Sequence, residues 1–156
     1  MIRQLILWLC PVAPARHRRG TAAIEFALIL PIIALLFTAL FDLGYLAYET
    51  MEVQAAAEAG AQYAAKNTWN AGAITAAVTS ATGMSGISAV PAPTQFCACP
   101  TGTTLSPATC GSTCSGGGTT GTYGQISAQK QHWTVLPYPT LPQPFIIAGQ
   151  AIRRLK

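Results

Sequence analysis

The strongest pattern in the chain is an apolar run from Phe26 to Tyr48, which follows a cluster of arginines. Four residues interrupt it: Pro31, Thr38, Asp42 and Gly44. Its length fits the roughly 30 Å hydrocarbon core of a bilayer, because an α-helix rises about 1.5 Å per residue. We therefore expect residues 21–48 to form a transmembrane helix. The alternative is a buried helix in the core of a soluble protein.

An alanine-rich stretch continues the helical pattern over residues 49–67. It contains no proline, and its helix propensity is high. Polar side chains recur at four-residue spacing and predict one polar stripe: Gln54, Glu58, Gln62 and Lys66. The other faces carry mostly alanine and Gly60, and small residues permit close approach between helices. These features predict one helix from Thr21 to Asn67, and two helices with a break near Gly44 are the alternative.

The rest of the chain predicts a small head. Residues 68–95 contain a weaker helical piece, 71–82, and a linker rich in Gly, Ser and Pro. In the head, residues 96–156, two segments have β character, 122–134 and 145–152, and four prolines separate them. We expect Trp133 to pack in a core or on a sheet face. The predicted fold class is α+β: a long N-terminal transmembrane α-helix, with a bend at Pro31, that extends into a small head with a short antiparallel β-sheet.

Four cysteines fall within 18 residues of the head: Cys97, Cys99, Cys110 and Cys114. A zinc site usually has two residues between the members of each close pair, whereas here there are one and three. Disulfides are therefore the better interpretation, and a small head with few large apolar residues needs such staples. Because Cys97 and Cys99 are poorly placed to bond each other, each is expected to reach Cys110 or Cys114.

Composition excludes several functions. Charged residues make up only 9% of the chain, against about 25% in soluble proteins. All five acids lie early in the chain, at Glu25, Asp42, Glu49, Glu52 and Glu58. The head therefore offers His132 no carboxylate of its own, which argues against acid–base catalysis. The sequence predicts no enzyme, no cofactor or metal, no small-molecule substrate and no nucleic-acid partner.

The charges also predict topology. Arginines precede the apolar run, and Glu49 and Glu52 follow it, which places the N-terminus in the cytoplasm and the head in the periplasm. Tyr45 suits the far interface of the inner membrane, as does Tyr48. Asp42 is expected near the far headgroups, solvated. The basic C-terminus, 153–156, is expected in solvent, with anionic lipid headgroups as an alternative partner.

Residues 1–20 allow several interpretations as a leader. A secretory signal peptide would use Arg3, the apolar stretch 5–12 and a cut site at 13–15. A lipoprotein cut before Cys10 and a twin-arginine signal are further alternatives. The short apolar stretch, followed at once by a far longer one, argues against all three.

The junction Gly20-Thr21-Ala-Ala-Ile-Glu25-Phe-Ala-Leu-Ile-Leu-Pro31 resembles the class III signal of type IV pilins and pseudopilins. More narrowly, it is similar to the TadE-like proteins of the tight-adherence (Flp) pilus system. The resemblance covers about residues 18–66 and implies that a prepilin peptidase cuts between Gly20 and Thr21. There are departures: Thr21 replaces the common Phe or Met, and the extension carries Ala and Gln where the family often has arginine.

This resemblance implies a minor pilin or pseudopilin that takes part in assembly of Flp pili or a related secretion filament. Its implied partners are prepilin peptidase, other Tad/Flp pilins with their assembly machinery, and inner-membrane lipid. Glu25 would pair with the amino terminus that cleavage exposes on a neighbouring subunit, and a solvated glutamate is the alternative. A second hypothesis is a single-pass periplasmic binding protein that does not polymerise.

Overall fold

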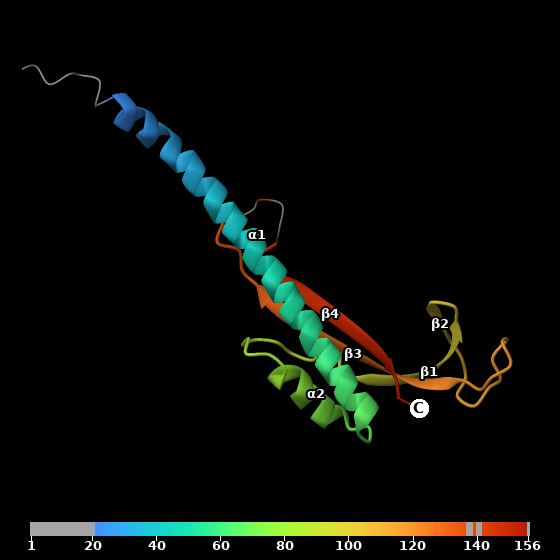
Figure 1. The fold of residues 1–156 in the computed structure, drawn as a ribbon. Helices are drawn as coiled ribbons and strands as arrows, with labels where there is room; N and C mark the ends of the chain where they lie inside the picture. The colour runs from blue at the N-terminus through green and yellow to red at the C-terminus, as the bar shows by residue number, and fades with distance from the viewer. Residues whose placement is uncertain (1–20, 137–138, 140–141, 156) are drawn as a thin grey trace, which may run out of the picture. The chain divides into compact units, whose positions relative to one another are not determined.

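A computed structural model describes residues 21–136, 139 and 142–155 of the chain (Figure 1). The elements follow in the order α1 (Thr21–Lys66), α2 (Ala71–Ser80), β1 (Thr94–Thr101), β2 (Thr104–Pro107), β3 (Gly121–His132) and β4 (Phe145–Arg154). Contacts divide the chain into two compact units, Met1–Leu40 and Phe41–Lys156. We call the second the folded unit. The predicted α+β class is confirmed.

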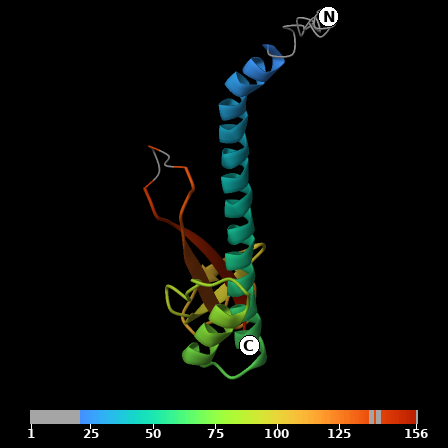
Figure 2. The same ribbon diagram turned by 90° about the vertical axis from the view of Figure 1, so that its left-hand side faces the viewer.

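Helix α1 runs for 46 residues without a break, so the alternative of two helices separated near Gly44 is wrong. Pro31 lies inside it, and Figure 2 shows a bend in the blue N-terminal part of the helix, as a missing backbone donor predicts. The helix ends at Lys66, and the next residue, Asn67, bonds to the last turn of the helix. Its backbone N–H and its side-chain amide both donate to the carbonyl oxygen of Tyr63, each at 3.0 Å.

The core of the folded unit lies between the second half of α1, helix α2 and the sheet (Figure 1). From α1 it takes mainly small side chains: Val53, Ala56, Ala57, Ala61 and Ala64. These face larger residues of the other elements: Ile74, Val78, Ile126 and Ile147. The alanine-rich extension thus uses its small face for packing within its own chain.

Two glycines make this close packing possible. A Cβ on Gly60 would lie 2.4 Å from a methyl carbon of Val78, in α2, and 3.0 Å from one of Ile126, in β3. A Cβ on Gly149, in β4, would lie 2.9 Å from the Cα of Gln54. Carbon atoms in contact normally lie about 3.5–4.0 Å apart, so neither position has room for a side chain. Because neither glycine carries a side chain, α1 can pack closely against α2, β3 and β4.

The four strands form one antiparallel sheet in the order β2-β1-β3-β4. The two strands predicted from the sequence correspond to β3 and β4, which pair from Tyr123–Arg154 to His132–Phe145. The hairpin of β1 and β2 was not predicted, and it turns at Gly102, whose φ of 62° favours glycine. Asn70 begins α2 by accepting a hydrogen bond from the backbone of Ala73 at 3.1 Å.

The predicted polar stripe of α1 meets an exposed sheet edge. Gln54 accepts a hydrogen bond from the N–H of Gln150 at 3.2 Å and donates one to its carbonyl oxygen at 3.1 Å. Because β4 is an outer strand, this side chain satisfies backbone groups that another strand would otherwise pair. Glu58 accepts a hydrogen bond from Gln54 at 3.3 Å. One member of the stripe therefore binds α1 to the sheet.

Candidate assembly and anchoring site

The N-terminal part of α1 exposes nearly all of its apolar side chains. It is long and apolar enough to cross a membrane, by length and composition. Exposed residues include Ile24, Phe26, Leu28, Ile32, Leu36 and Phe41. Gly20 and the predicted leader lie outside the described residues, and Thr21 is the first residue of the helix. This surface has the character of a helix that is covered by lipid or by other helices.

Glu25 lies on this exposed part of α1. Among the described residues it takes part in no ion pair. It stands four residues after Thr21, which is about 6 Å along a helix axis. The predicted pairing with an amine therefore requires a group from a second subunit, and it stays a prediction.

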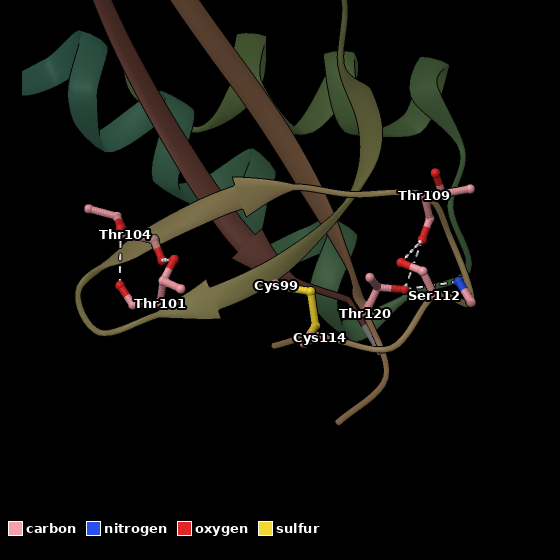
Figure 3. Close-up of a disulfide and its surroundings, with 8 residues drawn as sticks. Cys99, Thr101, Thr104, Thr109, Ser112, Cys114 and Thr120 are labelled. Carbon is pink, nitrogen blue, oxygen red and sulfur yellow. Dashed lines mark hydrogen bonds between the residues drawn. A yellow bond between two sulfur atoms is a disulfide. The ribbon is translucent and has the colours of Figure 1, made fainter. Parts of the chain in front are cut away.

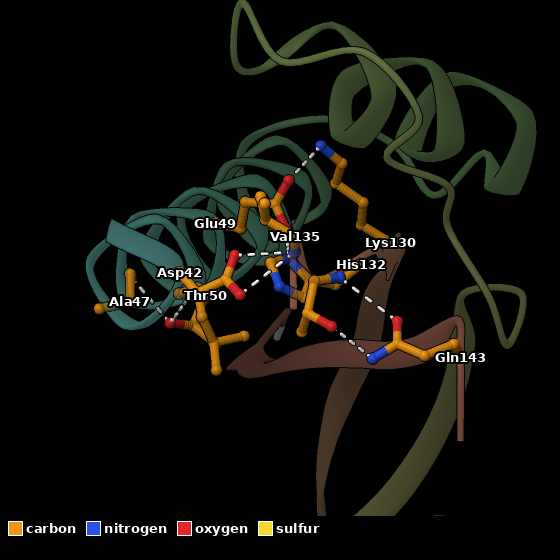
Figure 4. A network of polar contacts seen from close by, with 10 residues as sticks. Asp42, Ala47, Glu49, Thr50, Lys130, His132, Val135 and Gln143 are labelled. Atoms are coloured by element: carbon orange, nitrogen blue, oxygen red, sulfur yellow. Dashed lines mark hydrogen bonds and ion pairs between the residues drawn. The ribbon is translucent and has the colours of Figure 1, made fainter. Parts of the chain in front are cut away.

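Asp42 is buried, and the expectation that water solvates it is wrong. Its two carboxylate oxygens accept hydrogen bonds from the backbone N–H of Val135, at 3.0 and 3.1 Å, and one accepts from Leu136 at 3.2 Å (Figure 4). Only 5% of the residue is exposed. Bonds from two N–H groups to one carboxylate are charge-assisted, and they fasten the chain after β3 to α1.

Glu49 forms the second polar link between α1 and the sheet. One of its oxygens lies 2.7 Å from the Nζ of Lys130, and the other lies 2.5 Å from the Nδ1 of His132 (Figure 4). Burial raises the pKa of Glu49, but the hydrogen bonds of Lys130 and His132 and the positive charge of Lys130 outweigh burial. Together they hold that pKa below its ordinary value.

The sequence missed this cluster, although it contained a signal for it. Glu49 lies four residues before Val53 and seven before Ala56, which puts a carboxylate on the stripe of α1 that faces the core. Lys130 and His132 alternate with the strand period along the same face of β3 as Ile126. An acid on an apolar stripe and a basic pair on an apolar strand face together indicate a buried ion pair.

The head contains no carboxylate side chain of its own for His132, but Glu49 of α1 supplies one. A histidine held by a carboxylate is an arrangement that acid–base catalysis uses. Here, however, the side chain of His132 is fully buried, and within the described part of the chain its Nε2 has no hydrogen-bond partner. The arrangement joins α1 to β3 and gives a substrate no access to the ring.

The four cysteines of the head form two disulfides, as predicted: Cys97–Cys110 and Cys99–Cys114. The connectivity is crossed, because Cys110 lies between Cys99 and Cys114 in the sequence. Figure 3 shows Cys99–Cys114 beside hydrogen bonds that link Thr109, Ser112 and Thr120. The zinc alternative is wrong for these sulfurs. Among the described residues, no group of three His, Cys, Asp or Glu side chains could hold a metal ion.

One comparison with known proteins gave a match. The family model described as TadE-like protein matches residues 20–62. This segment is TadE-like. No curated protein and no solved structure matches the chain.

The TadE-like segment includes Glu49, which binds β3, and Asp42, which binds the chain after β3, and it begins one residue before α1. It also includes Glu25 and Gly60. The cysteines, all four strands and α2 lie beyond the match. The matched segment therefore supplies the carboxylates that hold α1 to the rest of the folded unit, and most of the small side chains with which α1 packs.

Trp133 lies beyond the TadE-like segment, and of the two places expected for it, a core or a sheet face, the core is wrong. It does not pack in the core: 65% of the residue is exposed. It follows His132, the last residue of β3, and therefore lies just beyond the end of the strand. Ile146, in β4, is exposed as well, and the two residues line one pocket with Lys130.

Proposed function

We propose that the chain is a minor pilin or pseudopilin of the tight-adherence (Flp) pilus system, held in the inner membrane by α1. The observation that carries this proposal is the TadE-like match, which begins at Gly20, followed at Thr21 by a helix with an exposed apolar surface. Prepilin peptidase cuts between Gly20 and Thr21 on the cytoplasmic side. The subunit then joins other Tad/Flp pilins and their assembly machinery.

The periplasmic location of the head agrees with its cysteine chemistry. Disulfides persist in oxidising compartments such as the bacterial periplasm. Both disulfides tie the loop after β2 to β1, at Cys97 and Cys99. The arginines before the apolar run favour the same orientation, with the N-terminus inside.

In this function, Glu25 sets the axial register of a subunit in the assembly. A carboxylate in the apolar layer costs on the order of 2.5 kcal/mol or more unless it is paired. The amino group that cleavage exposes on Thr21 is a cation, but the helix holds it about 6 Å along the axis from Glu25 of its own chain. The amine of a neighbouring subunit can pair with Glu25 at one axial position, which offsets this cost.

Processing is tested by mass spectrometry of the N-terminus of the full chain made in cells with and without prepilin peptidase. With the enzyme, the mature chain is expected to begin at Thr21, because the junction resembles a class III signal with its cut after Gly20, and the TadE-like match, which begins at Gly20, supports this expectation. Without the enzyme, residues 1–20 are expected to remain. A chain that begins at Met1 or Arg16 in the presence of the peptidase would contradict the proposal.

Glu25→Ala is expected to leave cleavage intact and to lower incorporation into filaments about tenfold or more, since an unpaired amine in the apolar layer costs about 2.5 kcal/mol. The measurement is the amount of variant in sheared filaments relative to the amount in membranes. Glu52→Ala removes a carboxylate of the same helix and serves as the matched control. Equal incorporation of the Glu25 variant and the wild type would argue for a solvated glutamate.

A further inference from the structure

Three large apolar side chains are exposed near the end of the folded unit that Asp42 holds. Trp133 is 65% exposed, Val135 75% and Ile146 60%. By contrast, Ile126 of β3 and Ile147 of β4 are buried in the core. Exposed apolar side chains gathered in this way mark a surface that meets another apolar phase.

Residues 134–136, which follow Trp133 and include Val135, have their backbone N–H groups bonded within the protein. The N–H groups of Val135 and Leu136 donate to Asp42, and the N–H of Thr134 donates to the side chain of Gln143 at 3.3 Å (Figure 4). The hydroxyl of Thr134 donates to the carbonyl oxygen of Leu136 at 2.7 Å. Non-helical backbone is tolerated at membrane depth only when its polar groups are satisfied by protein or water, and the N–H groups of residues 134–136 are satisfied by the protein.

The carboxylates of Asp42 and Glu49, both at this end, are bonded within the protein. Asp42 accepts backbone hydrogen bonds, and Glu49 pairs with Lys130 and His132. Downstream of Glu58 the sequence contains no carboxylate side chain. The surface around Trp133 and Val135 therefore presents apolar groups without a free negative charge that anionic lipid would repel.

Asp42 relates this surface to the predicted membrane span, because it stands at the end of the span in the sequence. About 20 apolar residues of helix cross a hydrocarbon core, so a span that begins at Ala22 ends near Phe41. Asp42 follows at once, and Tyr45, half exposed, is the kind of residue found at membrane interfaces. Val135 is bonded to Asp42, the residue that directly follows the apolar span in the sequence.

We propose that Trp133 and Val135 enter the interface of the membrane leaflet that the folded unit faces, with Ile146 beside them. The occupant of this surface is lipid, at the boundary of headgroups and acyl chains. This inference rests on the proposed anchoring of α1 in a bilayer. It adds a second membrane contact, which Asp42 holds in place and which orients the folded unit on the membrane before assembly.

The test is depth-dependent quenching of tryptophan fluorescence in the full chain, reconstituted in vesicles of phosphatidylcholine and phosphatidylglycerol. A Trp8→Phe background retains Trp69 and Trp133, and the further change Trp133→Phe isolates the signal of Trp133 by difference. Lipids brominated near the headgroup are expected to reduce Trp133 emission roughly twofold, as for side chains about 5–10 Å into the interface. Lipids brominated near the acyl-chain ends are expected to quench it less, and Trp69 is expected to change little with either.

Asp42→Asn should release the chain after β3 and reduce the quenching of Trp133, whereas Glu52→Gln, with the same change of charge, should not. Unchanged emission of Trp133 in protein that stays with the vesicles after an alkaline wash would overturn this inference and leave the anchoring intact. Protein that the alkaline wash removes would overturn both. Equal quenching in the Asp42 variant would overturn the role given to Asp42.

Discussion

Replacing Glu49 by alanine is expected to lower the free energy of unfolding of the folded unit by about 3–5 kcal/mol. The variant leaves the ammonium group of Lys130 and the ring of His132 in a site where their side chains are 13% and 0% exposed, without the carboxylate that pairs with both. A buried charge without its partner costs far more than a lost surface contact. The measurement is urea unfolding of the full chain in detergent micelles, followed by near-ultraviolet circular dichroism.

Glu52→Ala is the matched control, because Glu52 lies on the same helix and the structure gives it no ion pair within the described residues. Its cost should stay within about 0.5 kcal/mol. A triple variant, Glu49→Leu with Lys130→Met and His132→Leu, should be much less destabilised than Glu49→Ala, since no charge then remains buried. Equal stability of the Glu49 and Glu52 variants would show that the cluster does not hold α1 to the sheet.

The same cluster predicts how stability depends on pH. The pKa of Glu49 in the folded protein lies below its ordinary value of 4.5, so the unfolded chain binds this proton at a higher pH than the folded protein does. The stabilisation is therefore complete above pH 4.5 and is lost as pH falls through the lowered pKa. Glu49→Ala should remove this share of the acid sensitivity, while Glu52→Ala should retain it.

Removing the disulfide Cys99–Cys114 by a double change to serine is expected to destabilise β1, β2 and the following loop locally by about 3 kcal/mol. The bond joins residues 15 apart, and few buried side chains besides the cysteines support this part of the sheet. Hydrogen exchange followed by mass spectrometry should show protection there falling about a hundredfold, with the core of α1, α2, β3 and β4 little changed.

Cys10→Ser is the control for the chemical change, because Cys10 lies in the predicted leader. Loss of protection throughout the folded unit would contradict the local effect. Alkylation of all four head cysteines in the purified wild type without reductant would contradict the disulfides themselves.

Local patterns were sufficient for the long elements. Apolar length and alanine content predicted α1, and the alternation and aromatic content of residues 122–134 predicted β3 to within a few residues. The β1–β2 hairpin was missed because β2 has only four residues, and the strands contain cysteine, threonine and proline rather than an alternating apolar pattern. A segment of four residues is too short to show the apolar and polar alternation that predicts a strand.

The sequence alone determined the α+β class, the apolar helix, the presence of crossed or nested disulfides and the TadE-like junction at Gly20, because each depends on neighbouring residues or on spacing along the chain. Only the tertiary structure decided which groups the internal acids meet. Asp42 meets Val135 across 93 residues, and Glu49 meets His132 across 83. No local pattern encodes such distances, since they arise when the small face of α1 packs on the sheet. That packing turned two acids that resembled membrane flanks into the polar links of the fold.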